Sequence, residues 1–181
     1  DGVQIEYVFG DSEMKPPKIL AINEDFKAKG VLLQWICSSS HANALASRID
    51  EGKFPTLAQG PAKSVFESQY MYSYHPYYVD ATCSLFDWIM KNWKEDKAPR
   101  LAFLTADMPL GKECLRDEVI NYARQKGIEI VPTELVAMPA LDTTAELTRI
   151  TTGARRLPPR LLLAREGEKV AYFAVRLGMT G

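Results

Sequence analysis

The apolar run Val31–Ile36 ends in a turn of three serines, residues 38–40, and a helical pattern follows directly up to Gly52. An almost wholly apolar strand is typical of a parallel strand that is covered on both faces. After the serines, apolar residues recur at the spacing of one helix face. A strand that leads straight into a helix is the repeating unit of an α/β fold, so this stretch constrains the fold class more than any other.

The same alternation runs through most of the sequence. Strands are predicted at 3–9, 31–36, 54–58, 70–74, 101–104 and 128–132, and helices at 18–29, 42–52, 79–93, 112–126 and 143–150. Within the Pro- and Arg-rich stretch that follows, only 160–164 can pair in a sheet, and a last helix is expected at 166–177. Two such series predict two doubly wound lobes, residues 1–75 and 76–181.

Charge and composition exclude several classes of partner. The 181 residues carry 22 Lys and Arg against 23 Asp and Glu, evenly mixed, which argues against a nucleic-acid surface. No apolar run approaches the roughly 20 residues needed to span a bilayer. The three cysteines are widely spaced and accompany only two histidines. We therefore expect no metal site and no cofactor.

The serine turn is the strongest candidate for a binding site. The first N–H groups of a helix lack intrahelical partners and its N-terminus is electropositive, so a small anion can bind there without Lys or Arg. Ligands of open α/β sheets also bind beyond the carboxyl ends of the strands. Ser38 and Ser39 are therefore predicted to bind a compact anion such as a carboxylate. Serine is equally common as a simple helix cap, and that alternative stays open.

Two other segments carry candidate contacts. A Gly-Pro turn follows the strand 54–58, and the carbonyls of such a turn can point into a cleft. Tyr74, Tyr77 and Tyr78 belong to an aromatic-dense segment, and tyrosine supplies rigid contact area with a polar tip, so these residues are candidates to line a pocket. The alternative is that they pack and hydrogen-bond at a strand end.

Catalysis is the least favoured class of function. The sequence contains no GxSxG, P-loop or GxGxxG motif. Ser38 and His41 lie one helical turn apart, in the manner of a nucleophile and its base, but no orienting acid is evident. The sequence therefore predicts a binding protein rather than an enzyme.

Several segments carry a family resemblance. They are Ala98–Glu113, Lys126–Val131, Asp142–Ile150 and Arg176–Gly181. In order and spacing they resemble the solute-binding proteins of ABC importers for branched-chain amino acids. The turn Cys37–Ser40 is similar to the ligand turn that follows the third strand in that family.

The resemblance implies a type I periplasmic binding fold, in which two α/β lobes close on a ligand. It implies that Ser38 and Ser39 meet the carboxylate of the ligand, and that Ala58 and Gly60 offer carbonyls to its α-amino group. Leu110 stands where the family usually has a tyrosine. Binding of an amino acid rather than another carboxylate is therefore left open.

The resemblance also implies partners and a location. They are a small carboxylate-bearing solute, the membrane permease of an ABC importer, and a periplasmic or membrane-anchored extracellular setting. The family's first strand would precede Asp1 and its last third would follow Gly181, so uncovered sheet edges and apolar faces are expected. A cytoplasmic ligand-sensing domain on the same fold is the alternative function, and a signal peptide in the precursor would favour transport instead.

Overall fold

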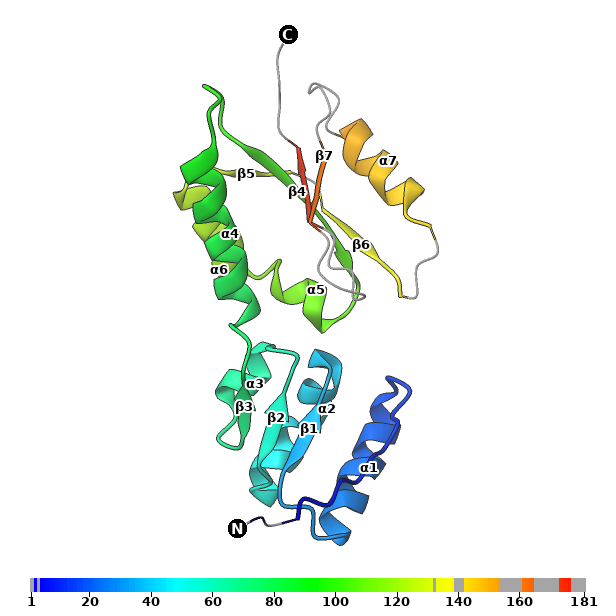
Figure 1. Cartoon of the computed structure of the whole chain (residues 1–181). Helices are drawn as coiled ribbons and strands as arrows, with labels where there is room; N and C mark the ends of the chain where they lie inside the picture. Colours follow the sequence, from blue (N-terminus) through cyan, green and yellow to red (C-terminus); the bar gives the residue numbers. More distant parts are fainter. Residues whose placement is uncertain are drawn as a thin grey trace. The chain divides into compact units, whose positions relative to one another are not determined.

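The chain divides into two compact units, Asp1–Tyr77 and Tyr78–Gly181 (Figure 1). The computed structural model describes residues 2, 4–131, 133–138, 142–153, 161–164 and 173–176. Within these residues, no helix has the length and apolar character that a membrane crossing requires. The assignment of the two units to two lobes of one ligand-binding protein stays a prediction.

The first unit is a three-stranded parallel sheet with three helices (Figure 1). Its elements are α1 (Pro16–Ala28), β1 (Gln34–Ile36), α2 (Ser39–Gly52), β2 (Thr56–Ala58), α3 (Lys63–Glu67) and β3 (Met71–Ser73). The strands follow the order β1-β2-β3, with Ile36 opposite Ala58 and Ala58 opposite Ser73. The predicted alternation from 18 to 74 is confirmed, except that the sequence analysis missed α3.

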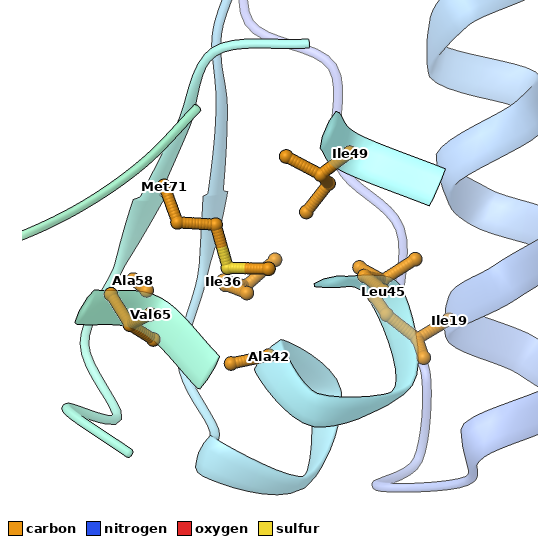
Figure 2. Packing of buried hydrophobic residues seen from close by; sticks show 8 residues of the cluster. All are labelled: Ile19, Ile36, Ala42, Leu45, Ile49, Ala58, Val65 and Met71. Carbon is orange, nitrogen blue, oxygen red and sulfur yellow. The ribbon is translucent and has the colours of Figure 1, made fainter. Parts of the chain in front are cut away.

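One face of this sheet carries the core of the first unit. Figure 2 shows Ile36 and Met71 on the strands directed toward the same interior as Leu45 and Ile49 of α2, both fully buried. Fully burying an aliphatic side chain contributes roughly 1.5–3 kcal/mol, so this cluster fixes the helices against the sheet. The whole cluster consists of Ile19, Ile36, Ala42, Leu45, Ile49, Ala58, Val65 and Met71.

The opposite face of the same sheet is open to solvent. Trp35, Leu57 and Tyr72 are cross-strand neighbours there, and Trp35 and Tyr72 are 55% and 53% exposed. Leu32, just before β1, is 86% exposed. The prediction that the run Val31–Ile36 is covered on both faces is therefore wrong. An apolar run shows that a strand can be buried, but the covering layer comes from elsewhere in a chain.

The strand predicted at 3–9 is not formed over its described residues, 4–9. Residues 4–10 have no regular secondary structure, and Ile5, Tyr7 and Phe9 are largely exposed. Alternating apolar and polar residues give a segment two distinct faces, but a strand also needs a neighbour for its N–H and C=O groups. Among the strands described, none pairs with this segment.

The second unit is built around one buried strand. Its elements are α4 (Tyr78–Asn92), β4 (Arg100–Ala106), α5 (Pro109–Glu113), α6 (Asp117–Gln125), β5 (Glu129–Ile130), β6 (Glu134–Val136), α7 (Thr144–Gly153), β7 (Leu161–Ala164) and β8 (Phe173–Arg176). Strand β4 pairs in parallel with β5 and β6, and antiparallel with β8, which also pairs with β7. The predictions for 79–93 and 101–104 are confirmed in type, and the strand predicted at 160–164 is confirmed over its described residues, 161–164.

Two predictions for the second unit are wrong. The helix predicted at 112–126 is two helices, α5 and α6, separated by residues 114–116. The helix predicted at 166–177 is contradicted at Phe173–Arg176, which form β8, and its other residues lie outside the described part of the chain. A short apolar run fits the residue spacing of a helix or of a strand. For Phe173–Arg176 the pairing with β4 decides in favour of a strand.

Lys53 is a position where the backbone conformation opposes the residue. It caps the C-terminus of α2 with φ 50° and ψ 41°, a left-handed conformation that costs a non-glycine residue about 1 kcal/mol. Lys53→Gly is therefore expected to raise the free energy of unfolding by roughly 0.5–1 kcal/mol, measured by urea denaturation. Lys53→Ala keeps the Cβ and is the control, and an equal gain from both variants would contradict the explanation.

Candidate functional site

The serine turn forms at the carboxyl end of β1. Ser38 is the N-cap of α2, and its Oγ accepts a hydrogen bond from the backbone N–H of Ser40 at 3.2 Å. The N–H of Ala42 donates to the carbonyl of Ser38 at 3.0 Å, which is the first bond of the helix. Ser38 and Ser39 are buried. The predicted helix start is confirmed, and the hydroxyl of Ser38 still has its own proton to donate.

Gly60 packs directly against this turn. A Cβ on Gly60 would lie 2.2 Å from the backbone N of Ser39 and 2.7 Å from the carbonyl carbon of Ser38. The sheet explains the approach, because the N–H of Gln59 donates to the carbonyl of Ile36 at 2.8 Å and keeps the two chain segments adjacent. Such an approach of one backbone to another requires glycine. The structure therefore brings Ser38, Ser39 and Gly60 together beyond the ends of β1 and β2.

Ala58 and Gly60 can contact a ligand only through their backbones. The side chain of Ala58 is fully buried in the core cluster. The carbonyl of Gly60 already accepts the N–H of Ala62 at 2.8 Å and has one further lone pair. The roles that the sequence analysis gave to these residues and to the two serines stay predictions.

Tyr74 and Tyr77 make packing contacts within the first unit. The indole N–H of Trp35 donates to the hydroxyl of Tyr74 at 3.3 Å, and the Tyr74 ring lies 4.5 Å from that of His75. Tyr74 therefore lies beside the exposed face of the sheet. The ring of Tyr77 lies 5.1 Å from that of Phe66 in α3. These contacts form without a ligand, and a ligand role for either residue stays a prediction.

Tyr78 and Leu110 belong to the second unit. Tyr78 begins α4. Burial of its side chain is the main reason that its pKa is raised to about 12, and the nearby Cys114 and Glu113 add to the rise. Its phenol is therefore neutral at physiological pH and can donate a hydrogen bond. Leu110 is half-buried in α5, and its carbonyl lies 3.8 Å from Sγ of Cys114. Burial likewise raises the pKa of the Cys114 thiol, which favours its neutral form.

A second glycine contact, which sequence reasoning missed, holds α5 against the end of β4. A Cβ on Gly111 would lie 2.1 Å from the carbonyl oxygen of Ala106 and 2.5 Å from Oγ1 of Thr105. Gly111 is thus required at the carboxyl end of a parallel strand, as Gly60 is in the first unit. That end is where open α/β sheets bind their ligands. The available signal was a glycine in the loop between the predicted strand 101–104 and the predicted helix 112–126.

His41 has a role that the sequence analysis did not foresee. It is 2% exposed, and its Nε2 lies 3.0 Å from Oγ of Ser12, which is also buried. The sequence indicates His41 only as a base for Ser38. The sequence carries no sign of the pair with Ser12, because 29 residues separate the two.

The sequence matches a known family. A family model described as "Periplasmic binding protein" matches residues 1–154. No curated protein was found to match the sequence.

Solved structures show the same fold. The chain is similar to a branched chain amino acid ABC transporter protein from Thermus thermophilus with bound valine, at 19% identity and a TM-score of 0.69 over 78% of this chain and 37% of that one. It is also similar to a solute binding protein of an ABC transporter from Rhodopseudomonas palustris BisB5 in complex with 3,4-dihydroxy benzoic acid. The identity is 20% and the TM-score 0.71, over 83% of this chain and 41% of that one. A fatty acid ABC transporter substrate-binding protein from Thermomonospora curvata matches at 19% identity and a TM-score of 0.73, over 82% of this chain and 38% of that one. The chain thus spans about two fifths of the length of these structures.

Proposed function

Because the chain belongs to the periplasmic binding protein family, we propose that it is part of the extracytoplasmic solute-binding component of an ABC importer. It has the type I α/β fold that its sequence predicts. The similar structures come from ABC transporters, which supports a membrane permease as the partner. The function is capture of a small solute, without a chemical step.

The convergence of Ser38, Ser39 and Gly60 beyond the ends of β1 and β2 is the observation that carries this proposal. The crevice at this end of an open α/β sheet is where ligands bind. The positive end of α2 lies there, as does the hydroxyl proton of Ser38, and both favour an anion. We propose that the two serines contact a carboxylate of the solute.

The solute class follows from the same chemistry. Valine and 3,4-dihydroxybenzoic acid, the ligands of two similar structures, share a carboxyl group. An amino acid would also need acceptors for its ammonium group, and the backbone carbonyls of Ala58 and Gly60 are our candidates. Leu110 offers no hydroxyl where the branched-chain amino acid binders are expected to have a tyrosine. We therefore propose a carboxylate solute, with a branched-chain amino acid as one member of the class.

The two units correspond to two lobes in this proposal. We propose that residues 1–75 and 76–181 are parts of the two lobes of a type I binding protein. The remaining proposed ligand contacts are Tyr74, Tyr77, Tyr78 and Leu110. Tyrosine hydroxyls and an aliphatic side chain fit a small solute that has one charged end and an apolar body.

Native mass spectrometry of the purified protein tests this function. We expect a co-purified small molecule that carries a carboxyl group and is released on denaturation. A thermal-shift screen with L-valine and 3,4-dihydroxybenzoate complements it, because a ligand of the native state raises the melting temperature by an amount that grows with the ratio of its concentration to its Kd. The matched controls are L-valinamide and 3,4-dihydroxybenzamide. Both amides lack the carboxylate, so stabilisation by the amides but not by the acids would contradict the proposal.

A further inference from the structure

Ser12–Lys15 is a tight turn with an unusual backbone. The N–H of Lys15 donates to the carbonyl of Ser12 at 2.8 Å, and the central residues Glu13 and Met14 have φ angles of 49° and 59°. Positive φ at both central positions is the mark of a type I′ turn, which favours Gly, Asn and Asp. Glutamate and methionine are strained there, and strained residues persist only where their surroundings hold them in place.

The contacts that hold the turn are of two kinds. Asp11 Oδ1 accepts the N–H of Glu13 at 2.8 Å, and the carboxylate of Glu13 pairs with Lys15 and Lys18. These contacts are exposed, so solvent screens them and they contribute little. The hydrogen bond between Ser12 and His41 is buried at both partners. It joins the turn to the helix that the serine turn begins.

We propose that His41 is a positioning residue of the solute site. Its side chain holds the turn Ser12–Lys15 against the first turn of α2, so that the turn Ser12–Lys15 forms one wall of the site. This inference rests on the proposed function. His41 follows Ser38 by three residues, so its side chain leaves α2 within the same helical turn as the cap. A displaced turn would therefore disturb the helix start against which Gly60 packs.

Three variants separate positioning from general stability. Ser12→Ala and His41→Leu each remove one partner of the buried hydrogen bond between the turn and α2. His41→Gln keeps a side chain that can donate and accept, and serves as the conservative rescue. Ser64→Ala is the matched control, because it removes a hydroxyl that donates to Asn43 of the same helix at 2.5 Å.

Amide hydrogen exchange at residues 38–42 is the readout that needs no ligand. Ser12→Ala and His41→Leu are expected to raise exchange there about tenfold, the effect of about 1.4 kcal/mol, without loss of the cooperative melting transition. Binding of L-valine or 3,4-dihydroxybenzoate, whichever stabilises the wild type, should weaken by about the same factor. His41→Gln and Ser64→Ala should stay near the wild type. The double variant Ser12→Ala/His41→Leu should lose no more than either single variant, because the two residues act as one unit.

The outcomes that overturn the inference are distinct from failure of the proposed function. Unchanged exchange at 38–42 in folded Ser12→Ala would show that the turn is not coupled to α2. Raised exchange with unchanged probe affinity would show that the turn is structural and not part of the site. If the wild type binds neither probe, the proposed function fails for these solutes, and the exchange data alone decide the coupling of Ser12 to the helix start.

Discussion

Gly60→Ala is expected to lower the free energy of unfolding by about 3 kcal/mol and to abolish the serine turn as a binding site. The new Cβ would lie 2.2 Å from the N of Ser39 and 2.7 Å from the carbonyl carbon of Ser38, and both atoms belong to the main chain. Inserting one carbon into a packed site typically costs 1–3 kcal/mol, and a main-chain neighbour cannot rotate away as a side chain can. Urea denaturation followed by circular dichroism measures the loss.

Gly52→Ala is the matched control for this prediction. Gly52 ends α2, and a Cβ there would meet Nζ of Lys27 at 3.1 Å, the far end of a flexible side chain. Alanine favours a helix over glycine by about 0.8–1 kcal/mol, so this variant should be no less stable than the wild type. The same chemical change is thus expected to destabilise the protein at position 60 and not at position 52. Equal losses at both would show that the approach at Gly60 is not the cause.

The sequence predicted best the elements whose formation depends on near neighbours in the chain. The start of α2 at the serines is such a case, because a cap bonds the amide of a residue two or three positions away. The helix α4 is another, since its apolar face recurs within one segment. Local chemistry determines both without reference to the rest of the fold.

The wrong predictions concern elements that depend on a distant partner. Ile5, Tyr7 and Phe9 alternate as in a strand, yet the segment has no neighbour among the described strands. Phe173–Arg176 forms a strand because β4, about 70 residues earlier, offers an edge to pair with. Pairing across such distances leaves no mark in a local pattern, so the same residues fit a helix equally well.

The candidate site shows the same division. The positions of Ser38 and Gly60 beyond the ends of β1 and β2 were predictable, because each residue follows a predicted strand. Their contact was not predictable, since it depends on the register of β1 against β2. The pair Ser12 and His41 needed the fold itself, because it joins a loop before α1 to a side chain on α2.

The charge of the solute is expected to have the other large effect. If the serine turn holds a carboxylate at the positive end of α2, the methyl ester of the same solute should bind about 100-fold more weakly or worse. A charge-assisted hydrogen bond contributes roughly 1.5–3 kcal/mol, and 100-fold corresponds to about 2.7 kcal/mol. The ester also loses the attraction of the helix dipole. Isothermal titration calorimetry of acid and ester on the wild type measures the difference.

Serine variants then show whether the hydroxyls share in that effect. Ser38→Ala/Ser39→Ala should weaken binding of the acid by about 10- to 100-fold and not abolish it, because the amides remain. Loss of the cap alone costs about 0.5–2 kcal/mol of stability, so Ser38→Gly, which preserves the helix start far better, separates capping from ligand contact. Ser84→Ala on the exposed side of α4 is the control. An ester that binds as tightly as the acid, or a double variant that binds like the wild type, would mean that the serine turn is a helix cap and that the solute is bound elsewhere.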